Sequence, residues 1–210
     1  MKYVVFDFNG TILDDVNVAV MAENVIIKKY LNRPPMGLDE YLHTFTFPVK
    51  DYYEKIGFKW DDGYTYEEVG DLWFEMYNKF KDEYKLYDGV IEVLQKSHDL
   101  GYKNILLSAS SLEPLKQQLR ELNIIDYFDE IIGNNNIYAE SKIENAKRWI
   151  ADKNPDDCMF IGDSLHDLQS ANAMKINNCV LVARGHQAKD VLLAEYDNVV
   201  DDIREVNLCV

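Results

Sequence analysis

Four separated stretches of the chain carry polar side chains of the kinds that handle an anionic group. Carboxylates supply oxygen ligands for a hard divalent cation and can attack as nucleophiles, while a serine hydroxyl and a lysine ammonium bind anions. The residues are Asp7 and Asn9 in DFNGT, Ser108 in NILLSASS, Lys142 in SKIEN, and Asp163 and Asp167 in GDSLHD. Such a set predicts a site in which a cation and a lysine together reverse the local sign of the charge for an anionic substrate.

Each of these residues has a plainer explanation when it is taken alone. Asp7 has the position of a turn or helix-capping aspartate, and Asp163 that of a cap for the helix beginning at Ser164. Ser108 alone is a turn serine, and Lys142 alone a solvated lysine. The catalytic interpretation depends on all four stretches occurring in order, each at the end of an element where a parallel sheet would gather them into one crevice.

The elements that must position these residues alternate between short apolar runs and helical periodicity. Strands are expected over residues 3–8, 104–108, 130–133, 158–161 and 179–182, with a weak one at 199. Helices are expected from 90 to 101, 112 to 122 and 141 to 151, after 164, and near 189–195. This alternation predicts an α/β fold with a mostly parallel, Rossmann-like sheet that helices cover on both faces.

Residues 15–86 depart from this alternation and show only helical spacing, with no convincing strand. We expect them to form an α-helical cap, inserted into a core made of residues 1–14 and 87–210, which lies over the site at the strand ends. The many aromatic residues of the cap fit the core of a small helical bundle better than the lining of a substrate pocket. Three cap lysines are candidates to meet a second anionic group: Lys28, Lys50 and Lys55.

Composition and charge exclude several classes of function. With 37 acidic residues against 22 basic ones and a net charge of -15, the surface should repel polyanions, so nucleic acid is not an expected partner. The 3 cysteines have no metal-type spacing, which favours a reducing compartment. The chain also shows neither a signal-peptide layout nor an apolar run long enough to cross a bilayer. We therefore expect a soluble, cytoplasmic protein without a membrane partner; the sequence leaves its oligomeric state open.

The ordered set of four motifs resembles the haloacid dehalogenase superfamily, and within it the phosphoglycolate phosphatase and β-phosphoglucomutase-like branch, in which a helical cap follows the first motif. The resemblance covers nearly the whole chain. It implies a Mg²⁺-dependent phosphatase or phosphotransferase for a small phosphorylated metabolite, in which Asp7 accepts the phosphoryl group as an aspartyl-phosphate.

The resemblance also implies a role for each residue of the set. The catalytic residues would be Asp7, Asn9, Ser108 and Lys142. The oxygen atoms that hold Mg²⁺ would come from Asp7, the backbone carbonyl of Asn9, and Asp163, with Asp167 either a further ligand or a residue that orients the ligands. The phosphate would be bound by Ser108, Lys142, Gly10 and Thr11.

Asn9 departs from the pattern of that family, whose phosphatases usually carry a second aspartate two residues after the nucleophile. That aspartate gives a proton to the leaving group and later takes one from water, which an amide cannot do at neutral pH. Because general acid–base catalysis is typically worth about 10²–10⁴-fold, the sequence predicts slow hydrolysis of ordinary phosphomonoesters.

Several explanations of Asn9 are compatible with the sequence. The substrate has a leaving group that needs no proton, as in an acyl phosphate; or a group on the cap replaces the acid; or Asn9 is an engineered substitution; or Asn9, followed by Gly10, deamidates to aspartate. His166 and His186 are further possible substitutes near the site, although a histidine on a surface turn is more often simply solvated. The competing function is that of a catalytically weak phosphate-ester-binding or regulatory protein that keeps the Mg²⁺ and phosphate pocket.

Overall fold

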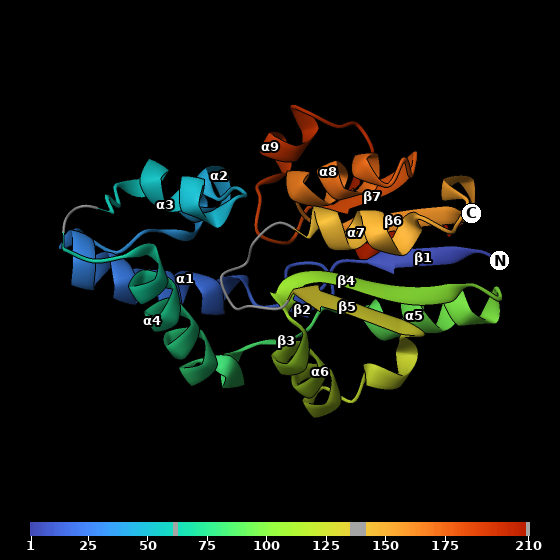
Figure 1. The fold of residues 1–210 in the computed structure, drawn as a ribbon, viewed down its shortest axis with the longest axis horizontal. Helices are drawn as coiled ribbons and strands as arrows, with labels where there is room; N and C mark the ends of the chain where they lie inside the picture. The colour runs from blue at the N-terminus through green and yellow to red at the C-terminus, as the bar shows by residue number, and fades with distance from the viewer. Residues whose placement is uncertain (61–62, 135–141, 209–210) are drawn as a thin grey trace.

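A computed structural model of the chain describes residues 1–60, 63–134 and 142–208 (Figure 1). Its centre is a six-stranded sheet with the strand order β5-β4-β1-β6-β7-β8, in which all neighbours are parallel. The strands are β1 (Tyr3–Phe6), β4 (Lys103–Ser111), β5 (Glu130–Asn134), β6 (Cys158–Gly162), β7 (Asn178–Val182) and β8 (Val199–Val200). A second group of helices lies beyond the carboxyl ends of these strands (Figure 1).

Helices cover both faces of the sheet because the strands are apolar on both sides. Along β1, Val4 and Phe6 pack on one face, whereas Val5 packs on the other. On the Phe6 side lie α5 (Val90–Asp99), α6 (Leu112–Glu121) and the 3₁₀-helix η5 (Ile203–Glu205). On the Val5 side lie α7 (Ile143–Ile150), α8 (Leu165–Ala173) and α9 (Lys189–Leu193). Two further 3₁₀-helices, η3 (Ile125–Tyr127) and η4 (Pro155–Asp157), connect helices to strands.

The helical group has a hydrophobic cluster of its own, built around Ile26, Tyr52, Tyr53 and Phe58. It contains α1 (Val16–Ile26), which continues as a π-helix η1 (Ile27–Leu31), then α2 (Leu38–Thr44), α3 (Val49–Ile56), α4 (Tyr66–Lys79) and the 3₁₀-helix η2 (Lys81–Glu83). A capping box fixes the start of α4, since Thr65 and Glu68 exchange side-chain to backbone hydrogen bonds.

The expectation of no strand in residues 15–86 was wrong at one place. Lys85–Leu86 forms β3, which pairs antiparallel with Leu13–Asp14, β2, so the chain enters and leaves the helical group through a two-stranded ribbon. Two-residue strands are too short to show an alternating pattern, which is why the sequence did not reveal them. The cap boundaries at residues 15 and 86 remain predictions, and the ribbon supports them.

The predicted α/β class with an inserted helical cap is confirmed, and the differences lie at the ends of elements. β1 stops at Phe6, two residues before the expected end, and α9 stops at Leu193. β4 runs on to Ser111. The expected start of α7 at residue 141 lies outside the described residues; the helix itself begins at Ile143, with Lys142 as its N-cap.

Within the described part of the chain, no helix has both the length and the apolar character needed to cross a bilayer.

Candidate active site

The parallel sheet brings the predicted residues to one edge. Asp7 directly follows β1, and its backbone N–H donates to the Ile161 carbonyl of β6 at 2.9 Å, which continues the strand pairing by one residue. Ser108 lies in β4, Asp163 directly follows β6, and Lys142 stands at the start of α7. All four are buried, with Asp7 7% and Lys142 1% exposed. The predicted convergence is therefore present.

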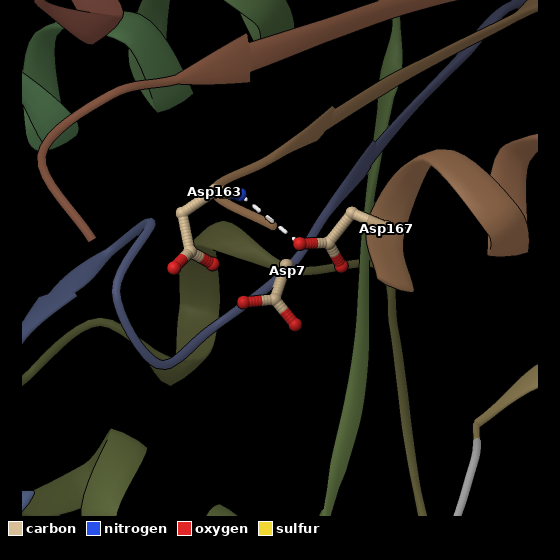
Figure 2. Close-up of side chains that lie close together, drawn as sticks. All are labelled: Asp7, Asp163 and Asp167. Carbon is tan, nitrogen blue, oxygen red and sulfur yellow. Dashed lines mark hydrogen bonds between the residues drawn. The ribbon is translucent and has the colours of Figure 1, made fainter. Parts of the chain in front are cut away.

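Three carboxyl groups form the centre of the site: Asp7, Asp163 and Asp167 each place an oxygen atom within 4.8 Å of the others (Figure 2). Burial and the neighbouring carboxylates raise the pKa of Asp7 well above its ordinary value, although Lys142 opposes this. The same causes, burial first and then Asp167, raise the pKa of Asp163 to about 7. A divalent cation would stabilise the ionised forms, and an all-oxygen donor set suits Mg²⁺.

Lys142 is the cation that the structure places inside this group. Its ammonium donates to Asp7 Oδ1, to Asp167 Oδ1 at 2.5 Å and to the Leu107 carbonyl at 3.2 Å, which uses all three of its N–H groups. Burial opposes the charge, but Asp167 and Asp7 together raise the pKa of Lys142, so it stays an ammonium. It holds Asp7 in place and offsets part of the negative charge.

Asp167 has little capacity left for a metal ion. Its Oδ2 accepts a hydrogen bond from the backbone N–H of Asp163 at 3.0 Å (Figure 2). The same oxygen accepts from the N–H and hydroxyl of Ser164 at 2.9 and 2.7 Å. Its Oδ1 is taken by Lys142. Ser164, with Asp167, forms the capping box of α8, so the helix is not capped by Asp163 as the plainer explanation had it. The geometry favours orientation of the site over metal binding as the role of Asp167.

Asp163 is packed tightly from the opposite side. Its carboxylate accepts from the Thr11 hydroxyl at 3.2 Å and from the His186 backbone N–H at 2.6 Å. A Cβ built on Gly185 would lie 2.1 Å from Asp163 Oδ2, and one built on Gly10 would lie 2.3 Å from the same atom. Both positions therefore need glycine if Asp163 is to keep this orientation.

A Gly185→Ala substitution should consequently displace Asp163. We expect it to lower the free energy of unfolding by about 1–3 kcal/mol, the usual cost of overpacking, and to weaken Mg²⁺ binding. Denaturant unfolding and a Mg²⁺ titration followed by calorimetry measure the two effects. Gly37→Ala is the matched control, because a Cβ at Gly37 meets nothing within 4 Å. Equal behaviour of the two variants would show that the Gly185 contact does not restrain Asp163.

Asn9 is held by a hydrogen-bond network that links the core to the cap. Its Nδ2 donates to Asp15 Oδ2 at 2.8 Å and to the Tyr77 hydroxyl at 3.1 Å, and its Oδ1 accepts from the Ser110 hydroxyl at 3.0 Å. The Tyr77 hydroxyl in turn donates to Asp15 at 2.6 Å. Sequence reasoning missed Asp15, Tyr77 and Ser110. The one available signal was an acidic residue where the first cap helix begins; nothing in the spacing distinguishes Tyr77 from a core residue.

The two histidines considered from sequence are in different electrostatic states. Burial opposes a charge on His186, but Asp15, whose Oδ1 lies 3.3 Å from His186 Nε2, and then Asp163 raise its pKa to about 9. The other ring nitrogen lies 2.9 Å from the Tyr41 hydroxyl. Burial lowers the pKa of His166 to about 4, and its ring stacks on Phe47 with centroids 4.3 Å apart. His186 is therefore a cation paired with Asp15, and His166 is neutral.

Gly10 and Thr11 are engaged with protein groups. The Gly10 N–H donates to the Leu13 carbonyl at 2.9 Å and to Asp15 Oδ1 at 3.0 Å, and the Thr11 hydroxyl lies between Asp7 and Asp163. Neither is among the described residues that line the cavity above Asp7. Their predicted part in phosphate binding remains a prediction.

A cavity of about 260 Å³ extends from Asp7 into the cap. Ser108 and Lys142 line it at the core end, and cap aromatic residues line it at the other. The sequence favoured a core role for those aromatics; Tyr52 and Tyr53 belong both to the cap core and to the lining, so the two roles coincide. The cap meets the core at the end of α2, where the Gln187 side chain donates to the Phe45 carbonyl at 2.9 Å.

Residues 4–181 match the family of haloacid dehalogenase-like hydrolases. The chain belongs to this family. A phosphoglycolate phosphatase from Pseudomonas putida is 24% identical to this hydrolase over 97% of the chain and 77% of its own length. The predicted family and its phosphoglycolate phosphatase-like branch are confirmed.

Solved structures show the same fold. A haloacid dehalogenase-like hydrolase from Streptococcus pneumoniae is 17% identical, covers 96% of this chain and 94% of its own, and superposes with a TM-score of 0.75. Protein tyrosine kinase A from Mycobacterium tuberculosis is 20% identical, covers 97% and 94%, and has a TM-score of 0.77. These similarities concern the fold of this hydrolase and not its reaction.

Proposed function

We propose that the protein is a Mg²⁺-dependent phosphatase or phosphotransferase that acts on a small phosphorylated metabolite through an aspartyl-phosphate on Asp7. The observation that carries the proposal is the buried Asp7 carboxylate, which Lys142 holds on one side and which Asp163 and Asp167 flank within 4.8 Å. The phosphatase names of sequence relatives support phosphoric monoesters as the substrate class.

Mg²⁺ fits the donors that are present. We propose Asp7, Asp163 and the backbone carbonyl of Asn9 as its ligands, and Asp167 as the residue that orients Lys142 and the turn after β6. The bound ion would offset the negative charges of the Asp7 carboxylate and the substrate phosphate, which otherwise repel each other. Removal of Mg²⁺ by a chelator should therefore stop phosphate release.

Three side chains take part in the first chemical step, the transfer of the phosphoryl group to Asp7. A carboxylate oxygen of Asp7 forms a bond to phosphorus while the bond from phosphorus to the leaving-group oxygen breaks. Lys142 orients Asp7 and favours its charged form, against the effect of burial. Ser108 Oγ accepts from the Ser110 backbone N–H at 3.0 Å, which leaves its own hydrogen free to donate to a phosphate oxygen.

Asn9 limits the rate at which this site can cleave a phosphate ester with a poor leaving group. Because its amide neither gives nor takes a proton, we propose that hydrolysis of ordinary phosphomonoesters is slow and that substrates with good leaving groups, such as acyl phosphates, react faster. The firm anchoring of the Asn9 amide favours a second candidate function, a weakly active phosphate-ester-binding protein.

Phosphate release from acetyl phosphate and p-nitrophenyl phosphate, with and without Mg²⁺, separates these two functions. The enzyme proposal predicts Mg²⁺-dependent release that is faster for acetyl phosphate. The binding proposal predicts Mg²⁺-dependent binding of a phosphate ester without release of phosphate from either compound.

Lys142→Met should reduce kcat/KM for acetyl phosphate by about 10²–10³-fold, since it removes the buried charge beside the nucleophile. Steady-state kinetics with the Mg²⁺-loaded protein measure the loss. Lys147→Met on the same helix is the control, because Lys147 is exposed and pairs only with Glu144 at 2.8 Å in the described structure. Similar rates for both variants would remove Lys142 from the proposed site.

The net charge of -15 makes nucleic acid an unexpected partner. We also propose a cytoplasmic location, because the cysteines favour a reducing compartment.

A further inference from the structure

Glu23 is a buried acid that the proposed chemistry does not use. It lies in α1, is 1% exposed, and lines the same cavity as Asp7. Within the described parts of the chain, its Oε1 has no hydrogen-bond partner. A buried carboxyl oxygen without a partner is costly, so its retention points to a group that enters the cavity and satisfies it.

The surroundings of Glu23 suit a cation. Four aromatic side chains that line the cavity interact with it electrostatically: Tyr41, Tyr52, Tyr53 and Trp73. Burial, only partly opposed by Tyr52 and Arg33, raises the pKa of Glu23 to about 8, which favours its protonated form at neutral pH. An entering ammonium would stabilise the carboxylate, and aromatic faces add a favourable cation–π contribution.

A second anionic group on the substrate would meet cations that already have carboxylate partners. His186, which lines the cavity, pairs with Asp15, and Arg33 pairs with Glu40. Among the described residues that line the cavity, the lysines are Lys142, which Asp7 and Asp167 hold, and Lys81, which pairs with Glu121 at 3.2 Å. The three cap lysines weighed from the sequence are exposed and lie outside this lining: Lys28, Lys50 and Lys55. A substrate carboxylate next to Glu23 would gain no charge pairing there, and it would oppose the ionisation of Glu23.

The position of Glu23 on α1 sets the length of the substrate. Glu23 follows Asp15 by eight residues, which corresponds to about 12 Å along the axis of an α-helix. Asp15 contacts Asn9 beside the nucleophile. A ligand that reaches both ends must therefore be longer than a two-carbon phosphate ester, and its middle lies against aromatic side chains.

We propose that the substrate is a phosphomonoester with an apolar or aromatic middle and an amino group at its far end, and that Glu23 binds this amino group as the ammonium ion. This proposal rests on the proposed function in one respect, which is that the phosphate of the substrate binds next to Asp7. It differs from the substrate named for the phosphoglycolate phosphatase relatives, which carries a carboxylate in place of the amine.

Calorimetric binding of phosphonates that cannot be hydrolysed tests the proposal without turnover. The ligands are ω-aminoalkyl phosphonates from aminoethyl to aminohexyl, each beside the alkyl phosphonate of equal length, in the presence of Mg²⁺. With the native chain, the longer amino compounds should bind about 10–100-fold more tightly than their alkyl partners, the range expected for a charge-assisted hydrogen bond. Binding near pH 7 should also release more protons with each amino compound than with its alkyl partner, because Glu23 ionises only in the first case. This additional release is measured by repeating the titrations in two buffers of different ionisation enthalpy.

Glu23→Gln should remove both the preference and the additional proton release, while alkyl phosphonates still bind as before. Glu75→Gln is the matched control, because Glu75 is exposed on α4 and does not line the cavity in the described structure. Equal binding of amino and alkyl compounds by the native chain overturns the proposal, even if Glu23→Gln does not fold. So does tighter binding of phosphonates that carry a carboxylate.

Acetyl phosphate separates this proposal from the proposed function. If Glu23→Gln loses the amino preference and acetyl phosphate is still hydrolysed, both proposals stand. If acetyl phosphate is not hydrolysed by the native chain but the amino preference is present, the phosphatase proposal fails and the assignment of Glu23 survives.

Discussion

Asp7→Asn is expected to lower the rate of phosphate release from acetyl phosphate by at least about 10³-fold, because an amide of the same shape cannot attack phosphorus. Among the described residues, the two neighbouring carboxylates are less available for attack: Asp167 has both oxygens engaged in hydrogen bonds, and Asp163 accepts from Thr11 and the His186 N–H. Continuous detection of phosphate with Mg²⁺ in excess measures the change.

The control for this variant is Asp126→Asn, since Asp126 is exposed in η3. Circular dichroism of both variants shows whether each is folded. A folded Asp7→Asn protein that kept native activity would mean that phosphorus is attacked by water or by another residue.

Asn9→Asp is expected to raise the hydrolysis of p-nitrophenyl phosphate and alkyl phosphates by about 10²–10⁴-fold, the usual contribution of a general acid–base group. The new carboxyl would lie where the Asn9 amide now donates to Asp15 at 2.8 Å. The charge of Asp15 would raise its pKa, which favours the protonated form that an acid catalyst needs. The increase should be larger for alkyl than for acetyl phosphate, because the poorer leaving group depends more on the proton.

A matched control is Asn17→Asp, on the exposed side of α1. If Asn9→Asp leaves the rates of all three substrates unchanged, another group already supplies the proton. His186 is then the first residue to test, because it is charged and its Nε2 lies 3.3 Å from Asp15 Oδ1.

The central residues could be predicted from the sequence because topology positions them. Asp7 and Asp163 directly follow adjacent parallel strands, with Phe6 paired to Ile161, so any fold with this strand order brings them together. Ser108, within β4, and Lys142, at the start of α7, lie near the same edge of the sheet. The alternation of strands and helices was therefore enough to predict the sheet, and the order of the motifs to predict which residues meet at its edge; the roles of these residues remain predictions.

The network around Asn9 could not be predicted because it depends on how the cap docks. Tyr77 and Asp15 are separated by 62 positions and meet only after α1 and α4 pack together. Glu23 likewise reads as one polar residue on an otherwise apolar helical face. Its burial follows from the aromatic residues of α2, α3 and α4, whose contacts the periodicity of a single helix does not specify.

The role of Asp167 shows a similar limit. GDSLHD predicts an acidic residue near the site, but its role depends on which atoms it contacts. In the structure its carboxylate accepts from two backbone N–H groups, the Ser164 hydroxyl and Lys142, and these contacts support the proposed orienting role.

Intact-protein mass spectrometry after acid quenching tests the central claim most directly. The native chain is mixed with Mg²⁺ and acetyl phosphate, quenched at intervals, and digested to locate the modification. Because Asn9 cannot activate water for the second step, we predict that one phosphoryl group accumulates on Asp7 and that Asp7→Asn stays unmodified. Steady release of phosphate from a chain that never carries this group, or a phosphoryl group on any other residue, would contradict the account.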